Sequence, residues 1–140
     1  MKTKLILAAT LLAFSTLAQA MPVKPAKCPS PASLAANGLN RNTVALDRDG
    51  LWAVGMMKNK YDTRDPWTFV IGRIRANNAD DAFQKATANL SSLSFQVGPI
   101  AVERINRWGC GYNTAAGYTA SAFTPNLEGI TITTVAHALN

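Results

Sequence analysis

The sequence predicts an α+β domain with a mainly antiparallel sheet packed against one main helix, a short N-terminal helix and one disulfide. Two apolar runs, residues 51–58 and 67–75, are separated by a polar connection, which is typical of a strand pair. A helix with clear capping signals follows this pair, and two or three strand-like runs come after the helix. This order of elements indicates the α+β class, with neighbouring strands running antiparallel.

The first twenty residues have the pattern of a secretory signal peptide. Lys2 and Lys4 give a positive start, residues 5–17 form an apolar run, and residues 18–20 (AQA) match a small-x-small cleavage site. The run is shorter than the roughly 20 apolar residues that a membrane-spanning helix needs. We therefore expect cleavage of residues 1–20, export to the periplasm or beyond, and no integral membrane segment afterwards.

The mature chain, residues 21–140, has the size of a single domain. We expect a proline-rich leader at 21–29 and one α+β domain at 30–140. Removal of Lys2 and Lys4 lowers the number of Lys and Arg residues from 14 to 12 against 8 acidic residues, so the net charge falls from +6 to +4. This mild basicity favours anionic partners. No clustered basic stripe or known module indicates nucleic-acid binding.

Two cysteines remain in the mature chain, Cys28 in the leader and Cys110 in the stretch "WGCGY". An isolated pair in an exported chain predicts a disulfide. The bond would close a loop that covers most of the mature chain, worth about 4.5 kcal/mol on the chain-entropy model. That is comparable to the whole net stability of a small domain.

The elements before the first apolar run are short. Proline and lysine alternate in the leader, which favours extended backbone. Ser30 followed by Pro31 predicts the start of a short helix that ends near residues 37–38 (Asn-Gly). Residues 39–48 are polar and predict an irregular segment, and residues 49–50 (Asp-Gly) predict the turn that opens the strand pair.

The second half of the chain begins with the clearest helix, residues 78–90, where Asn78 can cap the first turn. Residues 99–108 fit either a helix or an irregular strand. The stretches "WGCGYN" and "GYTASAFT" predict a hairpin with its bend near residues 114–116. The β-branched run "GITITTVAHA" predicts a closing strand.

No catalytic constellation stands out, and we expect no enzyme. A cysteine hydrolase would need Cys110 as a free nucleophile and the single histidine, His137, as its base. One histidine and two cysteines cannot complete a four-ligand zinc site within the chain. Residues 47–50 (DRDG) lack the spacing and the distal glutamate of a calcium loop. We therefore expect neither a metal site nor a required cofactor.

A binding surface is the remaining prediction. Two arginine pairs, Arg73 with Arg75 and Arg104 with Arg107, could hold an anion, because the planar guanidinium pairs well with carboxylates. The alternative interpretation is that the arginine side chains are solvated charges at strand ends. Most of the aromatic side chains should lie in the core.

The order of features also resembles a known family. The stretches "CPSP", "DPWTFVIG", "DDAFQKATANL" and "WGCGYN" followed by "GYTASAFT" are similar to small secreted hemin-binding proteins (Hbp) of gram-negative intracellular bacteria. The resemblance covers nearly the whole mature chain. That family is otherwise a domain of unknown function, so the resemblance implies a ligand class and no particular site residues.

The resemblance implies non-covalent binding of hemin or another hydrophobic anion. Hemin needs an apolar contact surface, cations for its propionates and an axial ligand. The residues we select as candidates are Arg73, Arg75, Tyr112 and Tyr118; further axial candidates are Met56, Met57 and His137. The bare side of the strand at Gly109 and Gly111 could admit either a flat ring or a closely packed helix. The alternative function is a secreted interaction module that contacts host or envelope proteins.

Overall fold

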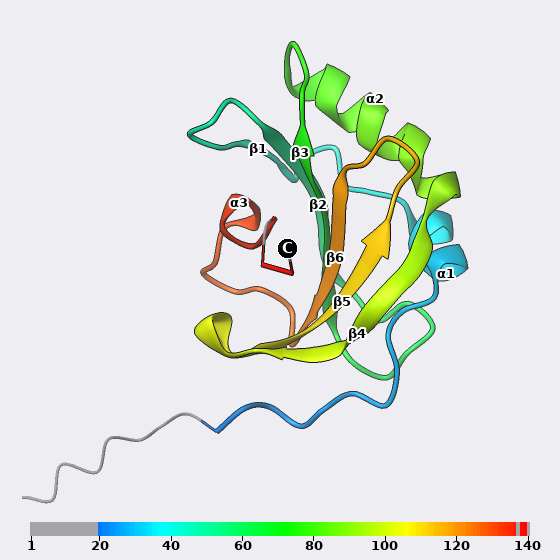
Figure 1. Ribbon diagram of the computed structural model, residues 1–140, viewed down its shortest axis with the longest axis vertical. Coiled ribbons are helices and arrows are strands. Elements are labelled where there is room, and N and C mark those ends of the chain that lie inside the picture. Colours follow the sequence, from blue (N-terminus) through cyan, green and yellow to red (C-terminus); the bar gives the residue numbers. More distant parts are fainter. Residues whose placement is uncertain (1–19, 137, 140) are drawn as a thin grey trace, which may run out of the picture.

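The computed structural model describes residues 20–136, 138 and 139, and within them the chain forms a six-stranded antiparallel sheet with helices on both faces (Figure 1). The strand order is β1-β2-β3-β6-β5-β4. The strands are β1 (Val44–Leu46), β2 (Trp52–Asn59), β3 (Trp67–Ile74), β4 (Ser94–Val102), β5 (Arg107–Asn113) and β6 (Thr119–Thr124). The predicted α+β class is confirmed. The predicted signal peptide falls almost wholly on residues 1–19, which lie outside the described residues, and so does His137.

The helices divide between the two faces of the sheet (Figure 1). Helices α1 (Pro31–Asn37) and α2 (Ala79–Asn89) cover one face, and the short helix α3 (Ile132–Val135) covers the other. Short 3₁₀ turns, η1 (Leu90–Ser92) and η2 (Glu103–Ile105), precede and follow β4. We call the α1/α2 side the staple face, because it carries the disulfide, and the α3 side the glycine face, because Gly72, Gly109 and Gly111 open onto it.

Both predicted helices begin at the expected capping residues. The Ser30 hydroxyl accepts a hydrogen bond from the amide of Ser33 at 3.1 Å, and the Asn78 side chain accepts one from the amide of Asp81 at 2.8 Å. These bonds satisfy amide groups that have no partner within the helix. Helix α2 then buries Ala82 and Ala86 against the sheet.

The segment at residues 39–48, predicted as irregular, contains the edge strand β1, so that prediction is wrong for Val44–Leu46. The strand pairs with β2, and hydrogen bonds between Gly55 and the segment continue the ladder beyond it. A three-residue strand leaves almost no periodicity to detect in the sequence, because its pairing with β2 decides its conformation.

Residues 99–108, for which helix and irregular strand were both open, belong mainly to strands. Strand β4 runs through Pro99 to Val102, one 3₁₀ turn follows, and β5 begins at Arg107. The β4–β5 register shifts twice, between Phe95 and Val97 and again before Ile100. The strand is therefore irregular, as the second alternative stated. The hairpin of β5 and β6 is confirmed.

The closing strand predicted from "GITITTVAHA" is wrong, because residues 132–135 form helix α3. Ile132 and Val135, three residues apart, are both buried and pack on the glycine face. A Cβ atom at Gly72 would lie 2.6 Å from the Cβ atom of Ala136, so the absence of a side chain at Gly72 lets this turn approach the sheet. Tertiary packing thus overrides the β propensity of the isoleucine, valine and threonine side chains.

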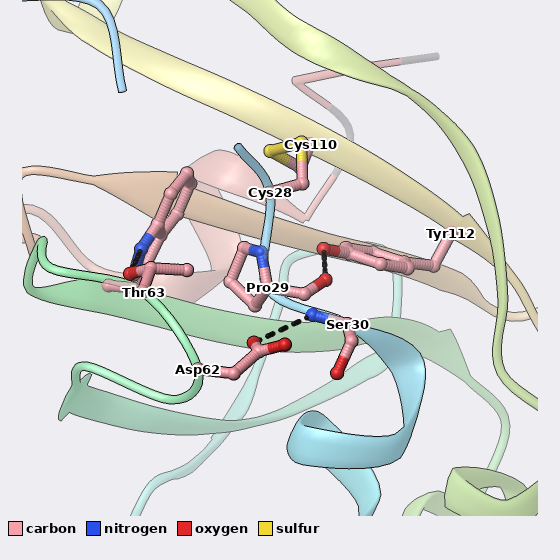
Figure 2. Close-up of a disulfide and its surroundings, with 8 residues drawn as sticks. Cys28, Pro29, Ser30, Asp62, Thr63, Cys110 and Tyr112 are labelled. Carbon is pink, nitrogen blue, oxygen red and sulfur yellow. Dashed lines mark hydrogen bonds between the residues drawn. A yellow bond between two sulfur atoms is a disulfide. The ribbon is translucent and has the colours of Figure 1, made fainter. Parts of the chain in front are cut away.

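Cys28 and Cys110 form the predicted disulfide, with a sequence separation of 82 and 5.9 Å between their Cα atoms. Figure 2 shows that the leader crosses the staple face at this point and is held by further hydrogen bonds. The Tyr112 hydroxyl donates to the carbonyl of Pro29, and the amide of Ser30 donates to the Asp62 carboxylate at 2.9 Å. The leader is therefore a fixed part of the fold from Cys28 onward.

The leader is also held before the disulfide. The Trp108 indole donates to the carbonyl of Pro22 at 2.7 Å, and the Lys24 ammonium lies 5.7 Å from the centre of the Trp108 ring. Among the described residues, no helix has both the length and the apolar character needed to cross a membrane.

Candidate ligand-binding site

Three of the four residues selected from the sequence line one cavity. Arg73, Tyr112 and Tyr118 border a cavity of about 380 Å³ between the ends of β3, β5 and β6, and Arg75 is not among its lining residues. The volume falls in the range of small-molecule sites, which hold roughly 300–1,000 Å³. The structure thus brings together residues that are up to 45 positions apart in sequence, Arg73 and Tyr118 being the extremes.

Arg73 owes its position to a bulge in β3. Trp52 pairs with Ile74 and Val54 pairs with Ile71, so β3 has one more residue than β2 across this interval. Ile71 and Ile74 therefore both point into the core of the staple face, three residues apart, and Arg73 takes a left-handed conformation with φ of 59°. Bulges of this kind redirect a side chain and end regular alternation.

The left-handed conformation of Arg73 has a cost that glycine would not incur. A non-glycine residue at positive φ is strained by about 1–2 kcal/mol, and such strain is found preferentially at functional sites. The Arg73 side chain is exposed and makes no ion pair or side-chain hydrogen bond within residues 20–136, 138 and 139. Its guanidinium thus stands at the cavity without a protein partner in this part of the chain.

Of the two glycines in the "WGCGY" stretch, Gly111 lines the cavity and Gly109 does not. Gly111 pairs with Ser121 across β5 and β6, and both line the cavity. A Cβ atom at Gly111 would lie 3.0 Å from a methyl group of Val97, so even alanine would crowd this space. Gly109, the other glycine, is covered by the side chains of Leu139 and Val102, each 3.0 Å from the position of a Cβ atom.

Two hydroxyl groups on β6 lack a partner in the described structure. Ser121 is 4% exposed, and its hydroxyl makes no hydrogen bond to any described residue. Thr119, which pairs with Gly72, buries its Oγ1 atom without a partner among the described residues. A buried polar group without a hydrogen bond costs about 1–3 kcal/mol, and native structures contain few of them. That cost applies to Thr119, whereas the Ser121 oxygen is not fully buried, so a polar ligand or water in the cavity can complete its hydrogen bonding.

The electrostatics of the cavity favour an anion. Arg73 is the one charged residue among the described lining residues, and no carboxylate lies beside it. The other polar side chains in the lining are Gln96, Asn113, Thr114, Thr119 and Ser121. Thr114 is already engaged, because its hydroxyl bonds the backbone of Tyr118 at 2.9 and 3.2 Å and closes the hairpin. Leu139 supplies an apolar wall.

The tyrosines differ in what their side chains do. The Tyr112 hydroxyl reaches through the staple face to Pro29, as Figure 2 shows, so the cavity borders the strand at Tyr112 and not this hydroxyl. Burial raises the pKa of Tyr112, and the charge of Asp62 and the neighbouring Tyr61 raise it further. Tyr118 is half-buried and lines the cavity, but its side chain packs against the core of the staple face.

The other residues considered from the sequence lie elsewhere. Arg107 bonds the backbone carbonyls of Ile105, Asn106 and Asn126, so it holds the turn before β5. Arg104 lies exposed in the adjacent 3₁₀ turn. Met56 and Met57 are half-buried on β2, and neither borders the cavity.

Cys110 carries no thiol, because its sulfur is bonded to Cys28 and the side chain is fully buried. The hydrolase alternative required that thiol, and its second residue, His137, lies outside the described residues. Within the described part of the chain, no three acidic, cysteine or histidine side chains come close enough together to hold a metal ion.

A second cavity, of about 470 Å³, lies under the leader. It is lined by residues 23–27 of the leader and by residues 62–65 of the loop after β2. Lys24, Lys27 and Arg64 share it with Asp62 and Asp65, and Asp62 already lies 3.8 Å from the ammonium of Lys27. The net charge of this lining is +1, as in the Arg73 cavity, but here carboxylates stand among the cations and can pair with them.

Sequence reasoning did not select Ser121, Thr119 or Gln96, which also line the cavity. Small and polar residues within a strand have no distinctive pattern, and only the register of β3, β5 and β6 places them beside Arg73. In the sequence, the glycine pair Gly109 and Gly111 was the one indication that this side of the strand is open.

No protein-family model, curated protein or solved structure matches this chain. The resemblance to hemin-binding proteins therefore stays a prediction, and the residues of the cavity are the basis for any functional conclusion.

Proposed function

We propose that this chain is an exported, non-enzymatic binding protein that holds an anionic ligand in the cavity beside Arg73. The observation that carries the proposal is the arginine itself. It occupies a strained backbone position at the cavity, without a described protein partner and without an acidic neighbour in the lining. An unpaired guanidinium in such a place is suited to a carboxylate.

Two features support export. Lys2, Lys4 and the apolar run after them have the pattern of a signal peptide. The Cys28–Cys110 disulfide is of a kind that persists in oxidising compartments such as the periplasm or the extracellular space. Both features are consistent with a protein that meets its ligand outside the cytoplasm.

Hemin is the ligand that the sequence resemblance implies, and its propionates are the groups that Arg73 would bind. Tyr118, which lines the cavity, is the candidate for an axial ligand, and its side chain would have to leave the core of the staple face to reach the iron. The polar side chains inside the cavity do not provide a flat apolar surface, so the ring would have to lie mainly outside it. Hemin therefore belongs in the first test together with smaller carboxylates.

The test is a titration of the oxidised mature protein with hemin, D-glucuronate and propionate at low salt. Arg73→Gln is compared with Arg75→Gln, a matched control two residues away and outside the cavity. We expect at least one of these anions to bind, with affinity falling about tenfold or more for Arg73→Gln and less than twofold for Arg75→Gln. For hemin, the Soret shift must exceed that of a similarly basic control protein. Absence of binding by all three anions, or equal effects of the two variants, would refute the proposal.

A second candidate function, an interaction module for host or envelope proteins, is favoured by β4. This strand lies at the end of the sheet, and Phe95, Val97 and Ile100 on it are 50%, 37% and 38% exposed. An exposed apolar edge strand without charged residues is a surface that another strand can pair with. If this function is correct, Ile100→Lys should abolish capture of an envelope protein, whereas Leu46→Lys on the opposite edge should not. Equal capture by both variants would exclude β4 as the interface.

A further inference from the structure

The residues that line the Arg73 cavity restrict the class of ligand that it can hold. We infer that the ligand is a small carboxylate that carries several hydroxyl groups, with the size and chemistry of a sugar acid. This inference rests on the proposed function, because it assumes that Arg73 binds the carboxylate. It adds the residues that recognise the rest of the molecule, and Ser121 is the first of them.

Ser121 and Gly111, which pair across β6 and β5, form the part of the lining that we call the floor of the cavity. Gly111 has no side chain, so the space above the serine hydroxyl stays open. The serine is 4% exposed and has no hydrogen-bond partner within the described chain. A buried hydroxyl that faces a cavity can both donate to and accept from a ligand hydroxyl. At the neighbouring pair of Gly72 and Thr119 the corresponding space is filled by Ala136, so the open position is the one at Gly111.

The walls of the cavity offer further polar groups. Gln96 and Asn113 line it, and neither side chain makes a hydrogen bond to another described residue. Each amide provides two donors and one acceptor oxygen, which suits alcohols whose hydroxyls both donate and accept. The Gln96 oxygen lies only 3.8 Å from the Cβ position of Gly111, so it is beside the floor.

The charge and the apolar wall distinguish this ligand class from others. One arginine and no lysine in the described lining suit a single carboxylate, whereas phosphate groups are usually held by several cations or by a helix N-terminus. Leu139 lies on one side of the cavity and can contact the carbon-bound hydrogens of a sugar ring. A flat macrocycle would leave Ser121, Gln96 and Asn113 without partners, and a site that leaves its polar groups unpaired binds such a ligand weakly.

The experiment is isothermal titration calorimetry on the oxidised mature protein with four probes. D-Glucuronate and D-galacturonate carry the carboxylate and the hydroxyls, D-glucose lacks the carboxylate, and propionate lacks the hydroxyls. We expect at least one uronate to bind about tenfold or more tightly than either glucose or propionate. Ser121→Ala should weaken uronate binding about tenfold and leave propionate binding unchanged, because the methyl group keeps the fold but cannot hydrogen-bond.

A second variant, on the opposite strand, tests whether the effect of Ser121→Ala comes from the cavity and not from a change in fold. Gly111→Ala fills the floor from the opposite strand and should also weaken uronate binding about tenfold, while its circular dichroism spectrum stays that of the parent protein. Binding of hemin or propionate that depends on Arg73, with neither uronate bound more tightly than propionate, would overturn the inference and leave the proposed function intact. Uronate binding that is unchanged in Ser121→Ala and Gly111→Ala would also overturn it. If no probe binds in a way that depends on Arg73, both this inference and the proposed function are overturned.

Discussion

The two faces of the sheet differ in the size of their side chains and in what covers them. The staple face buries Trp67, Phe69 and Tyr112 beneath α1, α2 and the disulfide-linked leader. The glycine face is covered by α3 (Figure 1) and by Leu139, and glycines stand at several of its strand positions. Large side chains fill one layer, and missing side chains leave room in the other.

The difference indicates how one small sheet can be stable and still hold a cavity. Burial of large aromatic side chains and a covalent link stabilise the staple face. The glycine face can then carry features that reduce stability, namely the strained Arg73 and the buried, unpaired hydroxyl of Thr119. Stability and binding are thus assigned to opposite sides of the same strands, so substitutions on the two faces should have different effects.

The largest expected effect is on the staple face. Replacing both Cys28 and Cys110 by alanine should lower the free energy of unfolding by about 4.5 kcal/mol, because the unfolded chain regains the entropy of a loop with a sequence separation of 82. Urea denaturation of the oxidised parent and the double variant measures the loss. An unchanged unfolding midpoint would contradict the role of the disulfide as the main constraint on the leader.

The next comparison removes one hydroxyl from each face. Tyr112→Phe leaves the buried carbonyl of Pro29 without its donor and should cost about 1–3 kcal/mol. Ser121→Ala removes a hydroxyl that has no described partner, so the free energy of unfolding should change by less than about 0.5 kcal/mol or rise. Chemical denaturation of both variants checks the contrast. Equal losses of unfolding free energy in the two variants would contradict the assignment of stability to the staple face.

A smaller effect is expected at the bulge. Arg73→Gly relieves about 1–2 kcal/mol of strain at φ 59° but increases the entropy of the unfolded chain by about 0.4–1 kcal/mol. The net result should be a gain in stability of about 0.5 kcal/mol, together with loss of anion binding. Arg75→Gly, at a position without positive φ, should be slightly destabilising and leave binding intact. Thermal unfolding distinguishes the two signs.

Much of the staple face could be predicted from the sequence. Cys28 and Cys110 are the two cysteines of the chain, and Ser30 and Asn78 mark helix starts by local chemistry. A helix cap is recognised from the residues next to it in the sequence, and the disulfide follows from the presence of two cysteines. The main strands were also predictable, because long apolar runs dominate their pattern.

The glycine face could be predicted only in part, because its structure depends on contacts between distant residues. Helix α3 has the composition of a strand, and its conformation follows from packing on Gly72 and Gly55. Arg73 was selected for its charge, but its left-handed conformation comes from the register shift between β2 and β3. Ser121 carries no signal of its own, since its role depends on its position opposite Gly111.

The smallest effect concerns the attachment of the leader and its dependence on pH. Partial burial alone would raise the pKa of the Asp62 carboxyl, but hydrogen bonds from Ser30 and the charge of Lys27 outweigh it, so the pKa lies below its ordinary value of 3.8. A lowered pKa in the folded state means that the ionised carboxylate stabilises the fold above pH 3.8, and that this contribution is lost as the pH falls through the folded-state pKa.

Because the Asp62 side chain is 38% exposed, solvent screens this interaction, and we expect it to contribute about 0.5 kcal/mol. The difference in unfolding free energy between the parent protein and Asp62→Asn should therefore be present at pH 6 and shrink as the pH is lowered below 3.8 toward 2.5. Denaturation at both pH values measures it, with Asp65→Asn in the same loop as the control. A difference that is undiminished at pH 2.5 would show that Asp62 holds the leader by its shape and hydrogen bonding and not by its charge.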